Sequence, residues 1–255
     1  MSVTGERRPA AASSATSVDV DAGHRRAVPG GGQLSDLGRR RCRSPASGAC
    51  RRRPYTRRVD PGSAPSPAWL GTSVLLVPVK AWGQAKGRLS AAVDPAGRAR
   101  LARRLATSVV RASGDMAAAV VCDDPEVASW ARDLGALVIW EPGRGLNAAV
   151  QEGVSRLAAA GVERVVVAHA DLPAARDLGW LAAFAGVTLV PDRRYDGTNV
   201  IALPAACRFV FSYGPGSYAR HRAESHRLAL GVRTIHGSPL SWDVDVPADL
   251  VPALQ

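Results

Sequence analysis

The chain has 255 residues and a formal net charge of +11, and 8 of these 11 excess positive charges lie in residues 1–70. That segment holds 13 arginines and 5 acidic residues, so the high isoelectric point describes it and does not indicate a basic binding face on a folded domain. No apolar run reaches the roughly 18 residues that a membrane-spanning helix needs, so we expect neither an integral membrane protein nor a membrane partner.

Residues 1–70 are rich in Ala, Ser, Gly, Pro and Arg, a composition that cannot offset the entropy of ordering. We expect a disordered tail, either a solvated extension or an over-extended gene start, followed by one folded domain over residues 71–255. Contact of the tail with nucleic acid or an anionic membrane is the alternative. The segment shows no secretory signal, and the chain has no C-x-x-C pair for a zinc site or disulfide framework, so we expect a cytoplasmic protein without a nucleic-acid partner.

From residue 73 onward, short apolar runs alternate with amphipathic segments. Strands are predicted over 73–79, 116–122, 136–140, 163–168, 187–190, 199–203, 232–235 and 242–246. Helices are predicted from 95 and from 125, and over 146–160, 174–185 and 217–230. Asp94-Pro95 and Asp124-Pro125 are helix starts, with Asp as the N-cap and Pro at the first helical position. This alternation predicts an α/β fold with a mostly parallel sheet.

Polar and glycine-rich segments follow the predicted strands, over residues 80–88, 141–147, 171–173 and 192–199. Parallel sheets bind ligands at the carboxyl ends of their strands, so this placement favours an enzyme. The first segment carries Lys80, Lys86 and Arg88 among glycines, a composition that can wrap a polyphosphate. It is not a Walker A loop, and a solvated basic turn is the alternative.

Three carboxylates are candidates for a metal site. Asp171 directly follows the strand predicted over 163–168, and Asp243 and Asp245 share one face of an extended segment whose valines, Val244 and Val246, face the core. Carboxylates that converge repel one another unless a cation lies between them, and Mg²⁺ binds through one or two carboxylates plus substrate phosphates. A helix cap at Asp171 and an exposed strand edge at 243–245 are the alternatives.

Gly214-Pro-Gly-Ser217 precedes a predicted helix and is a candidate anion site, because free backbone N–H groups, the positive helix end and a Ser hydroxyl can converge there. The turn over residues 196–199 adds the hydroxyl of Thr198. A glycine turn with an ordinary N-cap is the alternative for both segments. His221 lies one helical turn beyond Ser217, and we expect it behind the site rather than in it. A packing or surface residue without a part in the site is the alternative.

Eight short motifs occur together in one order. They are Val77-Pro-Val-Lys80, Ala85-Lys86-Gly-Arg88-Leu, Gly145-Leu-Asn147-Ala-Ala, Ala170-Asp171-Leu-Pro173, Pro191-Asp192, Gly197-Thr198-Asn199, Gly214-Pro-Gly-Ser217 and Asp243-Val-Asp245-x-Pro247-x-Asp249-Leu. In this order they resemble the guanylyltransferases of coenzyme F-420 (deazaflavin) biosynthesis, which activate phosphoenolpyruvate or 2-phospho-L-lactate with GTP. The resemblance covers about residues 74–250 and none of the tail.

The resemblance implies a GT-A-like nucleotidyltransferase fold, a Rossmann-like three-layer sandwich, that uses Mg²⁺ and releases pyrophosphate. It implies that Lys80, Lys86 and Arg88 hold the triphosphate and, with Asp171, are catalytic. It implies nucleoside contact by Asn147, metal binding by Asp171, Asp243 and Asp245, and acceptor binding by Thr198, Gly214 and Ser217. Tyr213, Tyr218 and Trp82 depart from the family's usual pattern and bear on the shape of the acceptor pocket.

The expected reaction joins phosphoenolpyruvate to GTP, giving enolpyruvoyl-2-diphospho-5'-guanosine. The Arg- and Ala-rich composition, typical of high-GC actinobacterial genomes, favours phosphoenolpyruvate over phospholactate. Related nucleotidyltransferases acting on a molybdopterin-type cofactor or a sugar phosphate are an alternative, although they usually carry a G-x-x-x-R-M-G loop. A non-enzymatic binding module led by the basic tail is the second alternative. Hand-over of the labile product to the next transferase of the deazaflavin pathway is left open.

Overall fold

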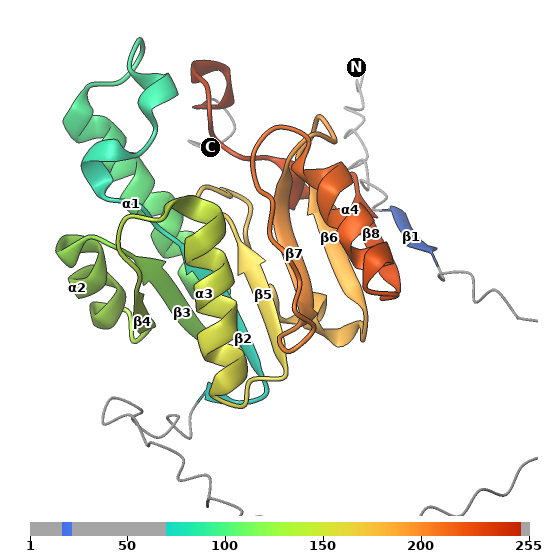
Figure 1. The fold of residues 1–255 in the computed structure, drawn as a ribbon. Helices are drawn as coiled ribbons and strands as arrows, with labels where there is room; N and C mark the ends of the chain where they lie inside the picture. Colours follow the sequence, from blue (N-terminus) through green and yellow to red (C-terminus); the bar gives the residue numbers. More distant parts are fainter. Residues whose placement is uncertain (1–16, 22–69, 251–255) are drawn as a thin grey trace, which may run out of the picture. The chain divides into compact units, whose positions relative to one another are not determined.

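The computed structural model describes residues 17–21 and 70–250, which contain one mixed sheet of eight strands (Figure 1). The strands are β1 (Ser17–Asp21), β2 (Ser73–Pro78), β3 (Ala117–Cys122), β4 (Leu137–Trp140), β5 (Arg164–Ala168), β6 (Val187–Pro191), β7 (Thr198–Pro204) and β8 (Val232–His236). Their order across the sheet is β1-β8-β6-β7-β5-β2-β3-β4.

The direction of the strands decides which loops meet. β2 pairs in parallel with β3 and β5, β3 with β4, and β6 with β8, whereas β7 runs antiparallel to both of its neighbours. Because β7 is reversed, its first residue, Thr198, lies beside Pro191 at the end of β6. The start of β7 therefore reaches the same edge of the sheet as the carboxyl ends of β5 and β6.

Within the described residues, four α-helices cover the sheet: α1 (Pro95–Arg111), α2 (Pro125–Asp133), α3 (Gly145–Ala159) and α4 (Ser217–Arg227). Both predicted Asp-Pro helix starts are confirmed. The Asp94 side chain accepts a hydrogen bond from the Gly97 N–H at 2.6 Å, and Asp124 accepts from two N–H groups of the first turn of α2 at 3.0 Å. The described residues also form short 3-10 turns: η2 (Trp82–Gln84), η3 (Gly87–Leu89), η4 (Gly179–Ala183), η5 (Pro239–Ser241) and η6 (Pro247–Asp249).

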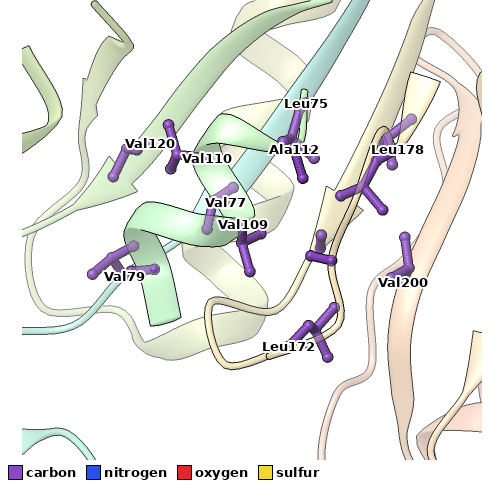
Figure 2. Packing of buried hydrophobic residues seen from close by; sticks show 14 of the residues in the cluster. Leu75, Val77, Val79, Val109, Val110, Ala112, Val120, Leu172, Leu178 and Val200 are labelled. Atoms are coloured by element: carbon purple, nitrogen blue, oxygen red, sulfur yellow. The ribbon is translucent and has the colours of Figure 1, made fainter. Parts of the chain in front are cut away.

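Alternate residues of each buried strand face opposite layers. In β2, Leu75 and Val77 pack with α1 and α2, whereas Val74 and Leu76 pack with α3 on the other face. Figure 2 shows the first layer, with Val109 and Val110 of α1 over the sheet. Strands buried on both faces read as continuous apolar runs, which is the pattern seen at 74–77. The predicted three-layer α/β sandwich is confirmed.

The helix predicted over 174–185 is wrong, because only the 3-10 turn η4 forms within it. Asp177 has φ of +29°, outside the right-handed helical region, and the N–H of Leu178 donates to the carbonyl of Ala112 at 2.7 Å. The apolar spacing that suggested a helix instead places Leu178 and Leu181 in the core. A tertiary hydrogen bond has thus replaced the helical one.

The strand predicted over 242–246 is also wrong, since this segment is irregular. Its amide groups find partners outside any sheet: Val244 N–H donates to the carbonyl of Asp171 at 3.3 Å, and the N–H groups of Asp245 and Val246 donate to the Asp249 carboxylate. Val244 is buried, as the alternation predicted, but Val246 borders the cavity described below rather than facing the core.

Five residues of the predicted tail are ordered as a strand. Ser17–Asp21 pairs antiparallel with β8, so the expectation of disorder is wrong for these residues. The exposed edge of β8 offers unpaired N–H and C=O groups to an extended segment, which gives a physical reason. Residues 1–16 and 22–69 lie outside the described residues, and the domain boundary at residue 70 stays a prediction. Within the described chain, no helix has the length and apolar character required to cross a bilayer.

Candidate active site

A cavity of about 1050 Å³ lies at the carboxyl edge of the sheet. Its wall is built from the segments that follow β2, β3, β4, β5 and β6, from the start of β7, and from the loop before α4. Except for Asn147, every residue predicted to act in catalysis or binding lines it: Lys80, Lys86, Arg88, Asp171, Thr198, Gly214, Ser217, Asp243 and Asp245. The volume is at the upper end of ordinary ligand sites and suits a large substrate pair.

The loop over residues 80–88, which carries Lys80, Lys86 and Arg88 and is called the cationic loop below, is anchored at both ends. Trp82 is buried and meets Trp130 of α2 edge to face, with ring centroids 5.0 Å apart. Leu89 is buried with Leu105 and Val244. Between these anchors, Lys86 adopts φ of +58°, which is uncommon for a residue with a side chain and is held by the surrounding packing. This backbone conformation contributes to placing the Lys86 side chain inside the cavity wall.

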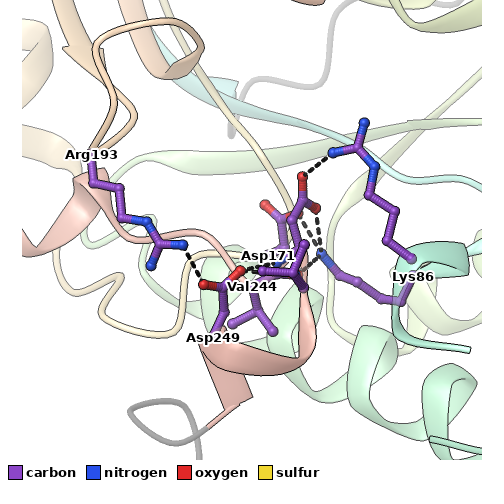
Figure 3. Close-up of polar contacts among 8 residues, drawn as sticks. Lys86, Asp171, Arg193, Val244 and Asp249 are labelled. Atoms are coloured by element: carbon purple, nitrogen blue, oxygen red, sulfur yellow. Dashed lines mark hydrogen bonds and ion pairs between the residues drawn. The ribbon is translucent and has the colours of Figure 1, made fainter. Parts of the chain in front are cut away.

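The ammonium of Lys86 joins the cationic loop to the carboxylates. It donates to Asp171 Oδ2 at 2.5 Å and to the carbonyl of Val244 at 2.7 Å, and it lies 3.7 Å from Asp245 Oδ1 (Figure 3). The Lys86 side chain is only 8% exposed. Arg88 lies 3.3 Å from the other oxygen of Asp245 but is largely exposed. The predicted meeting of Asp171 with the 243–245 segment is therefore observed, with Lys86 between Asp171 and Asp245.

The carboxylates on the acidic side of the cavity repel one another. Burial raises the pKa of the Asp243 carboxyl, and the nearby carboxylates of Asp171 and Asp245 raise it further. Asp171 Oδ1 is buried and has no hydrogen-bond partner within residues 17–21 and 70–250. Both observations fit a cation as a further partner. However, among these residues no group of three or more His, Cys, Asp or Glu side chains is gathered closely enough to hold a metal ion.

Asp249 supports residues 243–246, called the carboxylate segment below, from the side away from Lys86 (Figure 3). Its buried carboxylate accepts from the N–H groups of Asp245 and Val246 at 2.9 and 2.8 Å, and its other oxygen accepts from Arg193 at 2.5 Å (Figure 3). Arg193 also lies over the Trp242 ring, 4.3 Å from its centroid. Burial opposes ionisation, but these hydrogen bonds outweigh it and hold the pKa of Asp249 below its usual value. The Asp249 carboxylate thus supplies the hydrogen-bond acceptor that a neighbouring strand would have supplied if residues 242–246 formed the predicted strand.

The acceptor side of the cavity is only partly as predicted. Thr198 and Ser217 are both buried and line the cavity, at the starts of β7 and α4. The expected free N–H groups at residues 216–218 are not free: Gly216 N–H donates to Asp196 Oδ1, Ser217 N–H to the Gly214 carbonyl, and Tyr218 N–H to the Asp196 carbonyl. The glycine loop folds back on the 192–199 turn, which consumes these donors. Among the predicted groups, the hydroxyls of Thr198 and Ser217 and the Gly214 N–H remain able to donate to a ligand, because no described residue accepts a hydrogen bond from them.

Asn147 does not reach the cavity wall. Its Oδ1 accepts from the Tyr213 N–H at 2.6 Å, and its amide donates to the Tyr213 carbonyl at 3.4 Å. Asn147 therefore ties α3 to the segment that carries Tyr213, and its contact with a nucleoside stays a prediction.

Arg193, Asp249 and His169 were given no role from sequence, and Tyr213 was marked only as a departure from the family's usual pattern. Arg193 and Asp249 support the carboxylate segment. His169 is a half-buried and Tyr213 a buried side chain at the cavity, and the buried His169 Nε2 and Tyr213 hydroxyl lack hydrogen-bond partners in the described chain. Asp249 belongs to a quoted motif, so its spacing from Asp245 was a usable signal. Nothing local distinguishes His169, because only the fold brings its ring centroid to 5.1 Å from that of Tyr213.

A comparison with known protein families matches a range that begins close to the predicted domain boundary at residue 70. The family described as "Guanylyl transferase CofC like" matches residues 73–254. A phosphoenolpyruvate guanylyltransferase from Rubrobacter xylanophilus is 37% identical over 184 residues, covering 69% of this chain and 90% of that protein. One from Thermomonospora curvata is 40% identical over 191 residues, covering 71% of this chain and 82% of that protein.

Solved structures share the fold at low identity. A nucleotidyl transferase from Methanothermobacter thermautotroptrophicus has a TM-score of 0.54 and 16% identity, over 71% of this chain and 95% of that one. A protein from Desulfovibrio desulfuricans G20, provisionally described as a nucleotide-diphospho-sugar transferase, has a TM-score of 0.58 and 17% identity, over 70% and 84%. The fold is that of nucleotidyltransferases, and by its matched residues and relatives the chain belongs to the CofC-like guanylyltransferase family.

Proposed function

We propose that this protein transfers the guanylyl group of GTP to phosphoenolpyruvate, giving enolpyruvoyl-2-diphospho-5'-guanosine and pyrophosphate. Family membership supports guanylyl transfer, and the relatives named for phosphoenolpyruvate support that acceptor over 2-phospho-L-lactate. The reaction belongs, on this proposal, to coenzyme F-420 biosynthesis in the cytoplasm. Hand-over of the product to a following transferase stays a prediction.

The observation that carries the proposal is the position of Lys86. Its ammonium contacts Asp171 and Val244 and lies close to Asp245, so the cationic loop after β2 and two distant acidic segments form one wall. Phosphate groups bind beside cations and, through Mg²⁺, to carboxylates, and this wall supplies the cationic and carboxylate side chains for both contacts. Lys80 and Arg88, both exposed at the cavity, extend the positive side toward a triphosphate.

A divalent ion, Mg²⁺ in our proposal, fits the donor set of oxygen ligands. Asp171, with its unpartnered Oδ1, would hold it together with Asp243 and Asp245. Because the described carboxylates are not gathered into a complete site, substrate phosphates would supply the remaining ligands, as Mg²⁺ commonly requires. When bound, the ion screens phosphate charge and stabilises the departing pyrophosphate.

The chain's own residues have a modest chemical task. A phosphate oxygen of the acceptor attacks the α-phosphorus of GTP, a new O–P bond forms, and the bond to the β-phosphate oxygen breaks. A phosphate monoester has a second pKa of about 6 and is largely ionised at pH 7, so no general base is needed. Lys80, Lys86 and Arg88 hold the triphosphate, while Thr198 and Ser217 hold the acceptor by their hydroxyls. Catalysis then consists of aligning two anions and screening their repulsion.

The direct test is pyrophosphate release by the full-length protein with GTP, Mg²⁺ and either phosphoenolpyruvate or 2-phospho-L-lactate. We expect release with phosphoenolpyruvate, a much slower reaction with phospholactate, and the guanylylated product by mass spectrometry. ATP and CTP in place of GTP are the nucleotide controls. Turnover only with a sugar phosphate or a molybdopterin-type acceptor would assign the fold to a different substrate. Absence of release with every acceptor would overturn the proposal.

A further inference from the structure

We propose that His221 is a positioning residue that makes the Thr198 hydroxyl a hydrogen-bond donor toward the acceptor. The inference deepens the proposed function and rests on it, because it concerns how the acceptor's anionic group is held. His221 is fully buried on α4, and its ring lies between the main chain at Ser212 and the first residue of β7.

The hydrogen bonds of the ring decide its tautomer. The backbone N–H of Ser212 donates to His221 Nε2 at 3.0 Å, and a backbone amide can only donate. Nε2 is therefore unprotonated, and a neutral imidazole then carries its hydrogen on Nδ1. Nδ1 lies 3.0 Å from Thr198 Oγ1, so it donates to that hydroxyl oxygen.

This arrangement directs the hydrogen of the hydroxyl. Thr198 Oγ1 accepts from His221, and its own hydrogen needs a separate acceptor. Within residues 17–21 and 70–250, His221 is the only side chain hydrogen-bonded to this oxygen. Thr198 borders the cavity, so the available acceptor is a ligand atom there. A phosphate or carboxylate oxygen is the natural partner, and a hydroxyl that already accepts one bond donates more strongly to it.

The surroundings of the ring keep it neutral and fixed. Phe209, Phe211 and Tyr213 enclose it, with ring centroids 5.7, 6.2 and 4.9 Å away. Burial, reinforced by Arg220 and His169, lowers the pKa of His221 to about 4, with Glu224 acting in the opposite direction. A protonated ring would also place an Nε2–H against the Ser212 N–H. The Nδ1–H donor is thus maintained throughout the neutral range.

Two substitutions separate the two bonds of the ring. A Gln side chain reaches the position of Nε2, and an Asn side chain reaches that of Nδ1. His221→Gln keeps an acceptor for Ser212 but loses the donor to Thr198, whereas His221→Asn keeps the donor and loses the acceptor. We expect His221→Gln to raise KM for phosphoenolpyruvate about tenfold, the order expected when a hydrogen bond to a charged group is weakened. The KM for GTP should stay within about twofold, and His221→Asn should show a smaller rise than His221→Gln.

A double-mutant cycle asks whether His221 acts through Thr198. If it does, adding His221→Gln to Thr198→Val leaves KM for phosphoenolpyruvate within about twofold of Thr198→Val alone, because the hydroxyl is already gone. If the two effects multiply, or if His221→Asn is as impaired as His221→Gln, His221 has only a structural role.

Nitrogen-15 NMR of the histidines in the intact wild-type protein provides a readout that needs neither activity nor folded variants. We expect a neutral His221 ring protonated on Nδ1 between pH 5 and 8, in the range set by its pKa of about 4. A ring protonated on Nε2 would overturn the inference. Lack of pyrophosphate release by the wild-type protein would instead overturn the proposed function and leave the tautomer result standing, so the two failures are distinguishable.

Discussion

Lys86 and Asp171 are 85 residues apart in the chain, yet their side chains meet at 2.5 Å in the cavity wall. The contact joins the loop after β2 to the loop after β5, two adjacent parallel strands. It exists because the carboxyl ends of those strands lie side by side, and because Lys86 turns inward through a positive φ.

Replacing Lys86 should abolish most activity. In Lys86→Met, Asp171 and Asp245 lose their shared cation, and the triphosphate loses a buried donor. We expect kcat/KM for GTP to fall by about 100-fold or more, as for loss of a single preorganised donor at a reacting phosphate. Arg103→Met removes an exposed cation on the outer surface of α1 and is the matched control. Wild-type turnover in Lys86→Met, measured by pyrophosphate release, would contradict the assignment.

Asp249 should matter for both stability and activity. Asp249→Ala leaves Arg193 and two N–H groups unpaired, and breaking a buried ion pair of this kind costs about 3 kcal/mol. The carboxylate segment should also loosen, lowering kcat/KM about tenfold. Chemical denaturation and steady-state kinetics measure the two effects. Glu152→Ala removes the surface pair with Arg156 and should change stability by less than about 1 kcal/mol. Equal effects of the two substitutions would refute a special role for Asp249.

Acid should destabilise the protein partly through His221. Its pKa is about 4 in the folded chain, against an ordinary value of 6.5, so the unfolded chain binds the proton more readily between these pH values. The free energy of unfolding should therefore fall by up to about 3 kcal/mol as the pH drops from 6.5 to 4, and stay unaffected by this group above 6.5. Comparing pH-dependent denaturation of wild type with His221→Gln isolates the contribution. Identical slopes would show that the ring titrates normally when folded.

Metal removal should stop the reaction reversibly. Excess EDTA should abolish pyrophosphate release, and Mg²⁺ should restore it. Asp171→Asn should raise the Mg²⁺ concentration for half-maximal rate by about tenfold or more, because a neutral amide is a poorer ligand for a hard cation. Mg²⁺ alone should bind weakly by calorimetry, and a non-hydrolysable GTP analogue should strengthen its binding. Full activity in EDTA would remove the metal from the proposal.

Deleting residues 1–69 should leave turnover nearly unchanged, since the described residues that line the cavity all lie between Pro78 and Asp249. We expect kcat/KM to stay within about twofold, as for removal of a segment that contributes nothing to the site. The deletion also removes β1, so thermal melting should accompany the assay. Retained folding with lost function would favour the alternative in which the basic tail leads binding.

Local patterns predicted much of the sheet and helices. The apolar run at 73–79 and the Asp-Pro starts at residues 94 and 124 depend on neighbours within a few positions, and the structure confirms them. Residues 174–185 and 242–246 were assigned wrongly because their partners are distant. Leu178 bonds to Ala112, and Asp245 bonds to the Asp249 side chain instead of a strand. Periodicity does not report such hydrogen bonds.

The amino-acid sequence alone determined the fold class, the carboxyl-edge location of the site and the cationic and acidic residues that line it. The fold class and the location follow from apolar periodicity and from the polar segments that come directly after strands, whereas the roles of the lining residues follow from motifs that resemble the guanylyltransferase family. The tertiary structure decided that Lys86 lies between two carboxylates, that the donors at residues 216–218 are already used, and that His221 faces Thr198. Those relations depend on strand direction and side-chain packing across the sheet, which bring together residues that no local pattern relates.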